Sequence, residues 1–248
     1  MVSVCLAAFN GEKYFEEQVE SILMQLGSDD ELIISDDGSL DNTMEIVSLF
    51  CDKRMVVLHN QGKHGFVGNF ENALNHAKGD IIFLADQDDL WKSNKVKVIK
   101  EQLRQYDLVV HDAEMIDGEG CLLGNTYYST MHHKIDFLSN LWKTRWLGCC
   151  MAFRREVLEM CLPFPRNIVA HDYWIGMLGM LKFRYCFIDD ILICYRRHGN
   201  NTSPSGEKST NTIYYKIVTK RMNMLVALAN RCLRYTFQKH NMVFLCQL

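Results

Sequence analysis

Three carboxylates, Asp86, Asp88 and Asp89, stand within four positions directly after the apolar run 81–85. Such a run, bounded by turn residues, is typical of a buried parallel strand, and ligands in open α/β sheets gather at the carboxyl ends of these strands. Carboxylates this close raise each other's pKa unless a cation or hydrogen-bond donors offset their charge. The pattern therefore predicts an Asp-x-Asp site for a hard divalent metal. A helix cap by Asp88 or Asp89 is the alternative, and it explains one acid rather than three.

A second pair of acids, Asp36 and Asp37, follows the earlier apolar run 31–35 and precedes a glycine that permits a tight turn. The carboxylate of Asp37 is placed to accept a hydrogen bond from a base or a ribose. The alternative is that these acids only shape the turn. We favour a ligand role for Asp37 and a capping role for Asp41 and Asn42, which precede an expected helix.

Two more polar segments interrupt the apolar pattern. Residues 60–69 are rich in glycine and polar groups, as expected of a loop over a polar ligand. In this loop, Lys63 is suited to neutralise a phosphate, and a solvated loop charge is an equal alternative. His171 and Asp172 open an apolar helix, where an aspartate standing alone would be interpreted as an N-cap.

Strand-like and helix-like segments alternate through the first half of the chain, which predicts right-handed βαβ units and a parallel, Rossmann-like sheet. The first strand leads into Asn10-Gly11 without a Gly-x-Gly-x-x-Gly motif, which argues against an NAD-dependent oxidoreductase. We expect the alternation to give way to an irregular or antiparallel excursion over 112–142. The expected strands are 2–9, 31–35, 55–59, 80–85 and 108–111, and the expected helices are 12–25, 42–51 and 67–77.

The 248-residue chain has 48% hydrophobic and 23% charged residues and a net charge of -3, so nothing in the charge balance predicts nucleic-acid binding. Its 10 cysteines form no Cys-x-x-Cys pair and are expected as free, mostly buried thiols in a reducing cytoplasm. Zinc binding by Cys149 and Cys150 near His132 and His133 fits no usual spacing. The N-terminus is expected to be a first strand rather than a signal peptide, and no apolar stretch is long enough to span a membrane.

The last part of the chain differs in composition. Residues 203–210 are typical of a polar hinge, and residues 209–248 contain Lys and Arg but neither Asp nor Glu. Ile217, Leu225, Leu228 and Cys232 recur at helical spacing, so we expect a basic amphipathic helix. That helix either lies on an anionic membrane surface or packs on the preceding domain, and the two alternatives have equal weight.

Five short motifs, in order along the chain, resemble those of family 2 glycosyltransferases with the GT-A fold, and within that family the rhamnosyltransferase-like subgroup. The resemblance spans residues 2 to about 202. It implies an α/β GT-A domain over 1–202, with a mostly parallel, Rossmann-like central sheet flanked by helices, followed by a hinge and C-terminal helical segment over 203–248. The motifs lie at 8–11, 35–39, 86–91, 171–172 and 195–201.

The resemblance also implies a role for individual residues. Asp37, with Phe9 and Asn10 of the first turn, would bind the nucleotide, and Asp86 would lie near the ribose or the metal. Asp88 and His198 would hold Mg²⁺ or Mn²⁺ at the diphosphate, and Asp172 would be the general base. Phosphate or acceptor contacts are expected from Arg196, Arg197, Lys63 and Trp174. Phe9 stands where relatives often carry tyrosine, and His171 stands where many carry glutamate, which weakens transfer of acceptor assignments.

One base and one metal favour single displacement with inversion at the sugar. We therefore expect an inverting transferase that moves a sugar from a UDP- or dTDP-sugar to a glycan or lipid-linked acceptor. Its expected place is the cytoplasm, with peripheral contact to the inner membrane surface. The alternative is a non-catalytic protein of the same fold that binds nucleotide sugars, although such a protein has no need of a base. A nucleotidyltransferase is disfavoured because the first strand lacks a glycine-rich phosphate loop.

Overall fold

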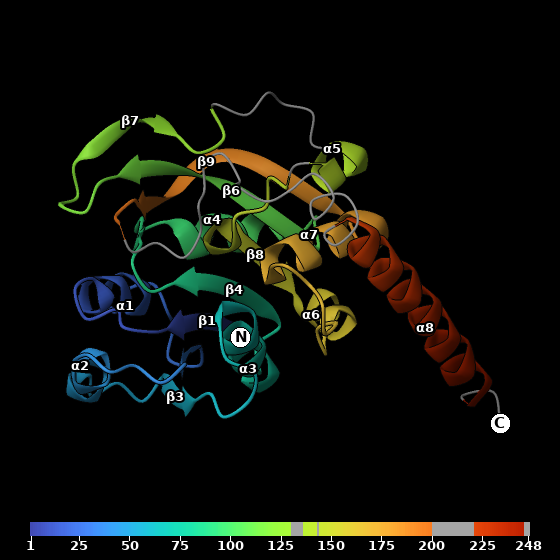
Figure 1. The fold of residues 1–248 in the computed structure, drawn as a ribbon, viewed down its shortest axis with the longest axis horizontal. Coiled ribbons are helices and arrows are strands. Elements are labelled where there is room, and N and C mark those ends of the chain that lie inside the picture. The colour runs from blue at the N-terminus through green and yellow to red at the C-terminus, as the bar shows by residue number, and fades with distance from the viewer. Residues whose placement is uncertain (130–135, 143, 200–220, 246–248) are drawn as a thin grey trace.

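A nine-stranded mixed sheet runs through the centre of the molecule (Figure 1). The computed structural model describes residues 1–129, 136–142, 144–199 and 221–245, with side chains described up to residue 235. The strand order is β3-β2-β1-β4-β8-β6-β9-β5, and β7 pairs with β6.

The N-terminal half of the sheet is parallel, as the alternating pattern predicts. β1 pairs with both β2 and β4, and β2 pairs with β3. Helix α3 packs on β1 and β2. The elements of this half are β1 (Val2–Ala8), α1 (Phe15–Leu23), β2 (Glu31–Asp36), α2 (Thr43–Leu49), β3 (Met55–His59), α3 (Phe66–His76) and β4 (Ile81–Asp86).

Beyond β4 the sheet is mixed. β8 runs antiparallel between β4 and β6, while β9 returns parallel to β6 and antiparallel to β5. The irregular segment expected over 112–142 includes the extension of β6 and its antiparallel partner β7. The elements are β5 (Leu90–Trp91), α4 (Lys95–Gln102), β6 (Leu108–Ile116), β7 (Leu122–Thr126), α5 (Phe137–Trp142), the 3-10 turn η1 (Gly148–Cys150), β8 (Met151–Arg154), α6 (Arg155–Cys161), α7 (His171–Lys182) and β9 (Tyr185–Arg196).

The pairing of β5 with β9 matters most for the site. Leu90 faces Cys194 and Trp91 faces Ile193, so the acids just before β5 meet the residues just after β9. β9 is not among the expected strands, because its apolar pattern is interrupted by Asp189 and Asp190, which are charged and exposed.

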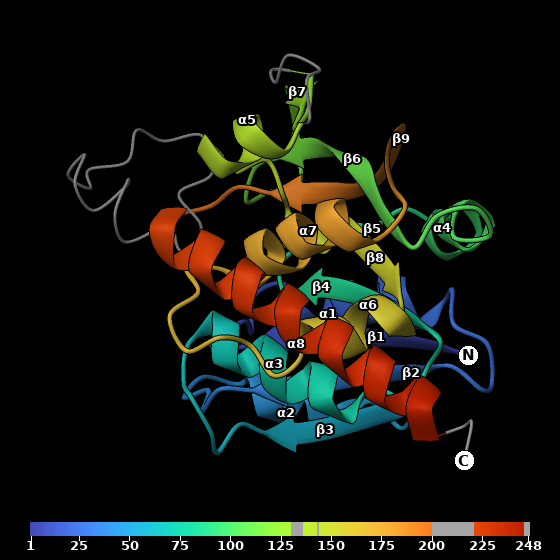
Figure 2. The same ribbon diagram turned by 90° about the vertical axis from the view of Figure 1, so that its right-hand side faces the viewer.

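Helix α8 (Asn223–Leu245) packs on the rest of the protein over the part whose side chains are described, residues 223–235. Met224 and Leu228 are buried, and the Arg231 guanidinium donates hydrogen bonds to the carbonyls of Met160, Leu162 and Pro163 at the C-terminal end of α6. In Figure 2 the helix crosses the molecule past α7 and α6. Of the two expected alternatives, these contacts favour packing on the rest of the protein over membrane binding for residues 221–235. The expected hinge, 203–210, lies outside the described residues, as do Ile217, His132 and His133.

The cysteines within the described part of the chain are all free thiols, as expected, although Cys51 and Cys121 are exposed. Among the described helices, none combines the length and the apolar character required to cross a bilayer.

Candidate active site

Asp88 and His198 meet where the loop between β4 and β5 lies against the segment that follows β9. Oδ2 of Asp88 lies 2.8 Å from Nε2 of His198, and both side chains are mostly buried. Asp88 lies in the loop between β4 and β5, and His198 follows β9, so the β5–β9 pairing brings them together. The His198 ring also packs on Tyr14, with 5.0 Å between the ring centroids. The two residues predicted to hold the metal are therefore adjacent.

Arg196 supports this loop from within. Its backbone N–H donates to Asp89 Oδ1 at 3.1 Å, and its Nε donates to the Asp88 carbonyl at 3.0 Å. The guanidinium pairs with Glu17 at 2.6 Å and lies over the Tyr14 ring. Only 4% of Arg196 is exposed, so these contacts support from inside the loop 87–89 between β4 and β5, here called the acid loop. A phosphate contact by Arg196 or Arg197 stays a prediction.

Glutamine side chains connect the acid loop to the first turn and to α1. Gln87 accepts a hydrogen bond from the Phe9 N–H at 2.7 Å and donates to the Phe9 carbonyl at 2.9 Å. Gln18, fully buried in α1, donates to the carbonyl of Asp86 at 2.7 Å. Gly11 leaves room for this arrangement, since a Cβ there would lie 2.6 Å from the Gln87 side chain.

The first turn itself has the shape expected of a ligand-facing loop. Asn10 adopts a positive φ of 50°, and its side chain accepts a hydrogen bond from Leu40 N–H at 2.7 Å. Phe9 is 51% exposed, so its ring is available to a ligand. Nucleotide binding by these two residues stays a prediction.

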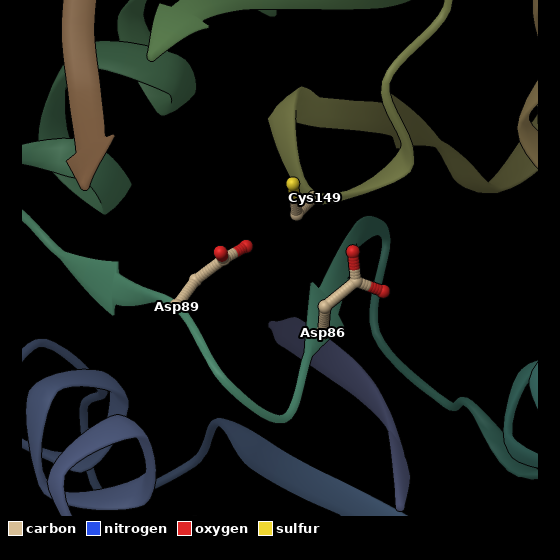
Figure 3. A group of neighbouring side chains, drawn as sticks. All are labelled: Asp86, Asp89 and Cys149. Atoms are coloured by element: carbon tan, nitrogen blue, oxygen red, sulfur yellow. The ribbon is translucent and has the colours of Figure 1, made fainter. Parts of the chain in front are cut away.

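Asp86 and Asp89 form a tight group with the thiol of Cys149. One atom from each, a carboxylate oxygen or Sγ, lies within 4.8 Å of the others, and Figure 3 shows the two aspartates extending toward the side of η1 that carries Cys149. Loss of hydration, followed by the charges of Asp88 and Asp172, raises the pKa of Asp86 to about 7. Burial likewise raises the pKa of Asp89 well above its usual value, and its Oδ2 has no hydrogen-bond partner among the described residues.

A hard divalent cation fits this arrangement. Raised carboxylate pKa values and an orphaned buried oxygen indicate negative charge that the described residues do not fully offset. Asp88 offers a carboxylate oxygen, the ligand type that such a cation prefers, and His198 offers an adjacent ring nitrogen. Cys149 is a poor ligand, because burial raises the pKa of its thiol well above the usual value and metals bind the thiolate.

Asp172 lies across η1 from these acids. The helix α7 has Ala170 at its N-cap position, so Asp172 belongs to the first turn rather than the cap. Burial raises the pKa of its carboxyl to about 6, opposed by hydrogen bonds from the backbone N–H groups of Tyr173 and Gly148. A raised pKa near neutrality suits a general base. The negative charge of Asp172 contributes to the raised pKa of Asp86, so the two carboxylates belong to one electrostatic unit.

His171 is buried next to Asp172 in the chain, and its imidazole is neutral. Its ring stacks on Phe70, with 3.9 Å between centroids, and burial lowers its pKa to about 3. Neither ring nitrogen has a hydrogen-bond partner among the described residues. The imidazole therefore acts here as a packed, uncharged wall next to Asp172.

Asp37 is held by the polar loop between β3 and α3. Its carboxylate accepts hydrogen bonds from the Asn60 side chain at 2.6 Å and from Gly65 N–H at 2.7 Å, and it lies 3.0 Å from His64 Nδ1. By contrast, the neighbouring Asp36 shapes its own turn through Ser39, which donates from its hydroxyl at 2.6 Å. The two acids thus have different roles, and base recognition by Asp37 stays a prediction.

Two of the predicted contact residues are engaged elsewhere. Lys63 donates to the carbonyl of Arg166 at 3.2 Å, so its ammonium is bound to backbone in this structure. Trp174 is fully buried, and its indole N–H donates to the Cys161 carbonyl at 3.0 Å. The predicted acceptor contact of Trp174 is therefore wrong in this structure. Its ring lies in the hydrophobic core of the protein, on the buried side of α7.

Sequence reasoning missed one charged residue of the site, Lys95. It is fully buried at the start of α4, and its ammonium donates to the Cys149 carbonyl at 2.7 Å. The only available signal was a lysine at a position where helical periodicity places Val96 and Ile99 against the core. A lysine in that pattern is ordinarily a surface residue, so the pattern alone carries little weight.

Comparisons with known proteins give consistent results. The family model "Glycosyl transferase family 2" matches residues 3–162. The chain is 35% identical to the Escherichia coli UDP-Glc:alpha-D-GlcNAc-diphosphoundecaprenol beta-1,3-glucosyltransferase WfgD, covering 84% of this chain and 81% of that protein. It is also 29% identical to an uncharacterized glycosyltransferase of Nostoc sp., covering 85% of this chain and 69% of the relative.

Solved structures share the fold at lower identity. S. aureus TarS 1-349 in complex with UDP-GlcNAc matches with a TM-score of 0.67 at 18% identity, over 93% of this chain and 71% of that one. The mannosyltransferase PcManGT of Pyrobaculum calidifontis, in complex with GDP-Man and Mn²⁺, matches with a TM-score of 0.58 at 21% identity, over 94% of this chain and 64% of that one. The predicted GT-A fold is thereby confirmed.

Proposed function

The chain belongs to glycosyl transferase family 2, and on that premise we propose that it transfers a sugar, with inversion, from a nucleoside-diphosphate sugar to a hydroxyl group of a lipid-linked glycan. Family membership supports sugar transfer in glycan synthesis. The inverting course, the donor class and the acceptor class are our proposal.

One relationship supports the proposal most directly. The buried carboxylate of Asp172 and the acids Asp86 and Asp88 interact electrostatically although they come from separate elements. A base on one side and a site for a cation and diphosphate on the other are what single displacement needs. We assign Asp86, Asp88 and Asp89 to the cation side and Asp172 alone to the base, and this assignment of a single base and no nucleophile supports inversion.

The residues divide the chemistry between them. Asp172 accepts the proton of the attacking hydroxyl, and the Gly148 N–H holds its carboxylate in place. Asp88 and His198 would hold Mg²⁺ or Mn²⁺, which when bound stabilises charge on the departing diphosphate. Arg196 keeps the Asp88 backbone fixed, so that these donors do not have to reorganise during the reaction. Asp37 would contact the base and Asp86 the ribose.

The relatives guide the choice of substrates. WfgD is named for transfer from UDP-Glc to a GlcNAc-diphosphoundecaprenol acceptor, and the TarS structure holds UDP-GlcNAc. We therefore propose a UDP-sugar donor ahead of a dTDP-sugar, and a polyprenyl-diphosphate-linked sugar as acceptor. Neither name points to rhamnose, so the rhamnosyltransferase-like subgroup stays a prediction.

We also propose that the reaction takes place at the cytoplasmic face of the inner membrane. The described cysteines are free thiols, as is usual in a reducing compartment. A lipid-linked acceptor would keep the enzyme near the membrane surface. The basic residues of α8 are the candidate contact with the membrane surface, although the described part of this helix also packs on the rest of the protein.

The proposal is tested by a donor screen. Purified protein is incubated with UDP-, dTDP- and GDP-sugars, Mn²⁺ and a short-chain polyprenyl-diphosphate GlcNAc acceptor, and nucleoside diphosphate release is measured with and without acceptor. We expect acceptor-stimulated release with one UDP-sugar and a product of inverted anomeric configuration. Tight donor binding without release, under every donor and acceptor, would instead support the alternative of a non-catalytic nucleotide-sugar binding protein.

A further inference from the structure

The three-residue turn η1 lies between the two chemical halves of the site. At one end the Gly148 N–H hydrogen-bonds to the carboxylate of Asp172. In the middle, Cys149 Sγ lies within 4.8 Å of a carboxylate oxygen of Asp86 and of Asp89, in the group drawn in Figure 3. Any shift of this turn would therefore change the spacing between the base and the acids.

The turn is held from behind by Lys95. The ammonium donates to the Cys149 carbonyl at 2.7 Å and lies 4.0 Å from the centroid of the Trp91 ring. Lys95 is fully buried and makes no ion pair within 4.0 Å among the described residues. The carbonyl and the ring face are thus its direct partners.

Such a placement is costly without a compensating charge. A buried ammonium is unfavourable unless hydrogen bonds and opposite charges offset the lost hydration. Here the offset comes partly from Asp86 and Asp89, which interact favourably with the ammonium through η1. Because a hydrophobic residue would fill the same space at lower cost, the retained charge suggests a role in the site.

We propose that Lys95 is a positioning residue of the active site: its hydrogen bond to the Cys149 carbonyl fixes η1 between Asp172 and the acid loop, and its charge weakens the attraction of the acids for a divalent cation. The inference rests on the proposed function, because it assumes that the acids bind a cation. A weaker cation site would let the metal leave with the nucleoside diphosphate.

Three variants separate the two effects. Lys95→Gln removes the charge but keeps an amide donor for the Cys149 carbonyl. Lys95→Met removes both. Lys97→Met is the matched control, because Lys97 is an exposed lysine on the same helix. Thermal unfolding of each variant reports whether it is folded.

The first readout is Mn²⁺ binding without turnover, measured from free Mn²⁺ by electron paramagnetic resonance, alone and with UDP. Both Lys95 variants should bind Mn²⁺ about threefold more tightly, the scale expected for one charge acting over several ångströms through a medium of fairly high dielectric. Damage to the fold would change the affinity in the opposite direction. The Lys97→Met protein should match the wild type.

The second readout is turnover with the donor found in the screen. Lys95→Met should lower kcat by roughly 10- to 100-fold, as expected for misplaced groups, while Lys95→Gln should retain most of it. Unchanged or weaker Mn²⁺ binding by folded Lys95→Gln would overturn the charge effect, and wild-type kcat in Lys95→Met would overturn the positioning effect. If Lys95→Met does not fold, Mn²⁺ binding by Lys95→Gln decides the charge effect. In that case a 10- to 100-fold loss of kcat in Lys95→Gln, which keeps a donor, would overturn the role of the hydrogen bond.

Failure of the proposed function looks different. A wild-type protein that binds neither Mn²⁺ nor UDP contradicts the metal-dependent transferase itself, and the inference falls with it. A wild-type protein that binds both, with Lys95 variants that behave like the control, contradicts the inference alone.

Discussion

Asp88 Oδ2 and His198 Nε2 lie 2.8 Å apart although 110 positions separate them in the chain. The contact exists because β5 and β9 pair antiparallel, so that the loop before one strand meets the segment after the other. Arg196, two positions before His198, donates a hydrogen bond from Nε to the Asp88 carbonyl of the same loop. The Arg196 guanidinium also forms an ion pair with Glu17. The candidate cation site therefore depends on the second half of the sheet as much as on the acid motif.

Asp88 should be essential for cation-dependent binding. Asp88→Asn replaces a charged oxygen ligand by a neutral amide, a poorer ligand for a hard cation, and should weaken Mn²⁺-dependent UDP binding as well as turnover by at least about tenfold. Calorimetry with UDP and Mn²⁺ measures the first effect. Asp190→Asn, at an exposed position of β9, is the control. Full activity in excess chelator would contradict metal dependence.

Asp172 should affect the chemical step rather than donor binding. Asp172→Asn keeps the shape of the side chain but cannot accept the proton, so kcat should fall by a factor on the order of 100 or more. The affinity for UDP with Mn²⁺ should change little. The two values come from steady-state rates and from calorimetry on the same preparation. Turnover equal to wild type with a hydroxyl acceptor would make Asp172 a structural residue of α7.

The pH dependence of the reaction should report the same residue. Because the pKa of Asp172 is about 6, and only the deprotonated carboxylate accepts a proton, kcat/KM should fall as the pH drops below about 6 and level off above it. Rates measured from pH 5 to 9 in buffers of constant ionic strength locate this limb. In Asp172→Asn the residual rate should lose the limb. An acidic limb near pH 4 would mean that burial of Asp172 is relieved in solution.

The carboxylate of Asp86 should lower the free energy of unfolding at pH values where it is ionised. Its folded pKa, about 7, lies above the usual value, so the folded state binds the proton more tightly than the unfolded state does. By linkage, the contribution of Asp86 to stability should fall as the pH rises from about 4 through 7, and this loss is complete above the folded pKa.

Asp86→Asn removes that titration. At pH 8 it should raise the free energy of unfolding by about 1 to 3 kcal/mol, and the gain should shrink toward zero near pH 4. Urea unfolding at both pH values measures the difference. Lower stability of Asp86→Asn at pH 8 would show that Asp86 has a stabilising partner in solution.

The basic character of α8 should be visible in membrane binding. Each Lys or Arg near an anionic surface contributes about 1 kcal/mol of attraction, which salt weakens. Truncation of α8 would expose the buried Met224 and Leu228, so charge removal is the cleaner test. Arg234→Gln with Lys239→Gln should reduce sedimentation with anionic vesicles and leave the low binding to neutral vesicles unchanged.

The matched control for this prediction is Lys97→Gln with Lys100→Gln, two exposed lysines on α4. If both double variants sediment like the wild type, α8 is only a packing helix, as its contacts with Met160 and Leu162 already favour for its first part.

The sequence alone determined the parallel half of the fold and the acids that end its strands. Apolar runs bounded by turn residues are local signals, and parallel strands place their carboxyl ends at one edge, so Asp37 and Asp86 could be located without coordinates. The bounds of β3 agree with the expected 55–59. Those of β1 and β2 each differ from their expected bounds by one residue at one end, and those of β4 differ by one residue at both ends.

Only the tertiary structure decided which of the remaining polar residues belong to the site. Arg196 and Trp174 were chosen by motif, yet the first supports the acid loop from inside and the second is buried in the core. Lys95, by contrast, carries no motif and lies directly behind η1. The hydrogen bonds of Arg196 and Lys95 join positions 108 and 54 apart in the chain, and that of Trp174 joins positions 13 apart. Local periodicity does not encode such pairings, because burial and partner choice are set by how β8, β9 and α7 pack together.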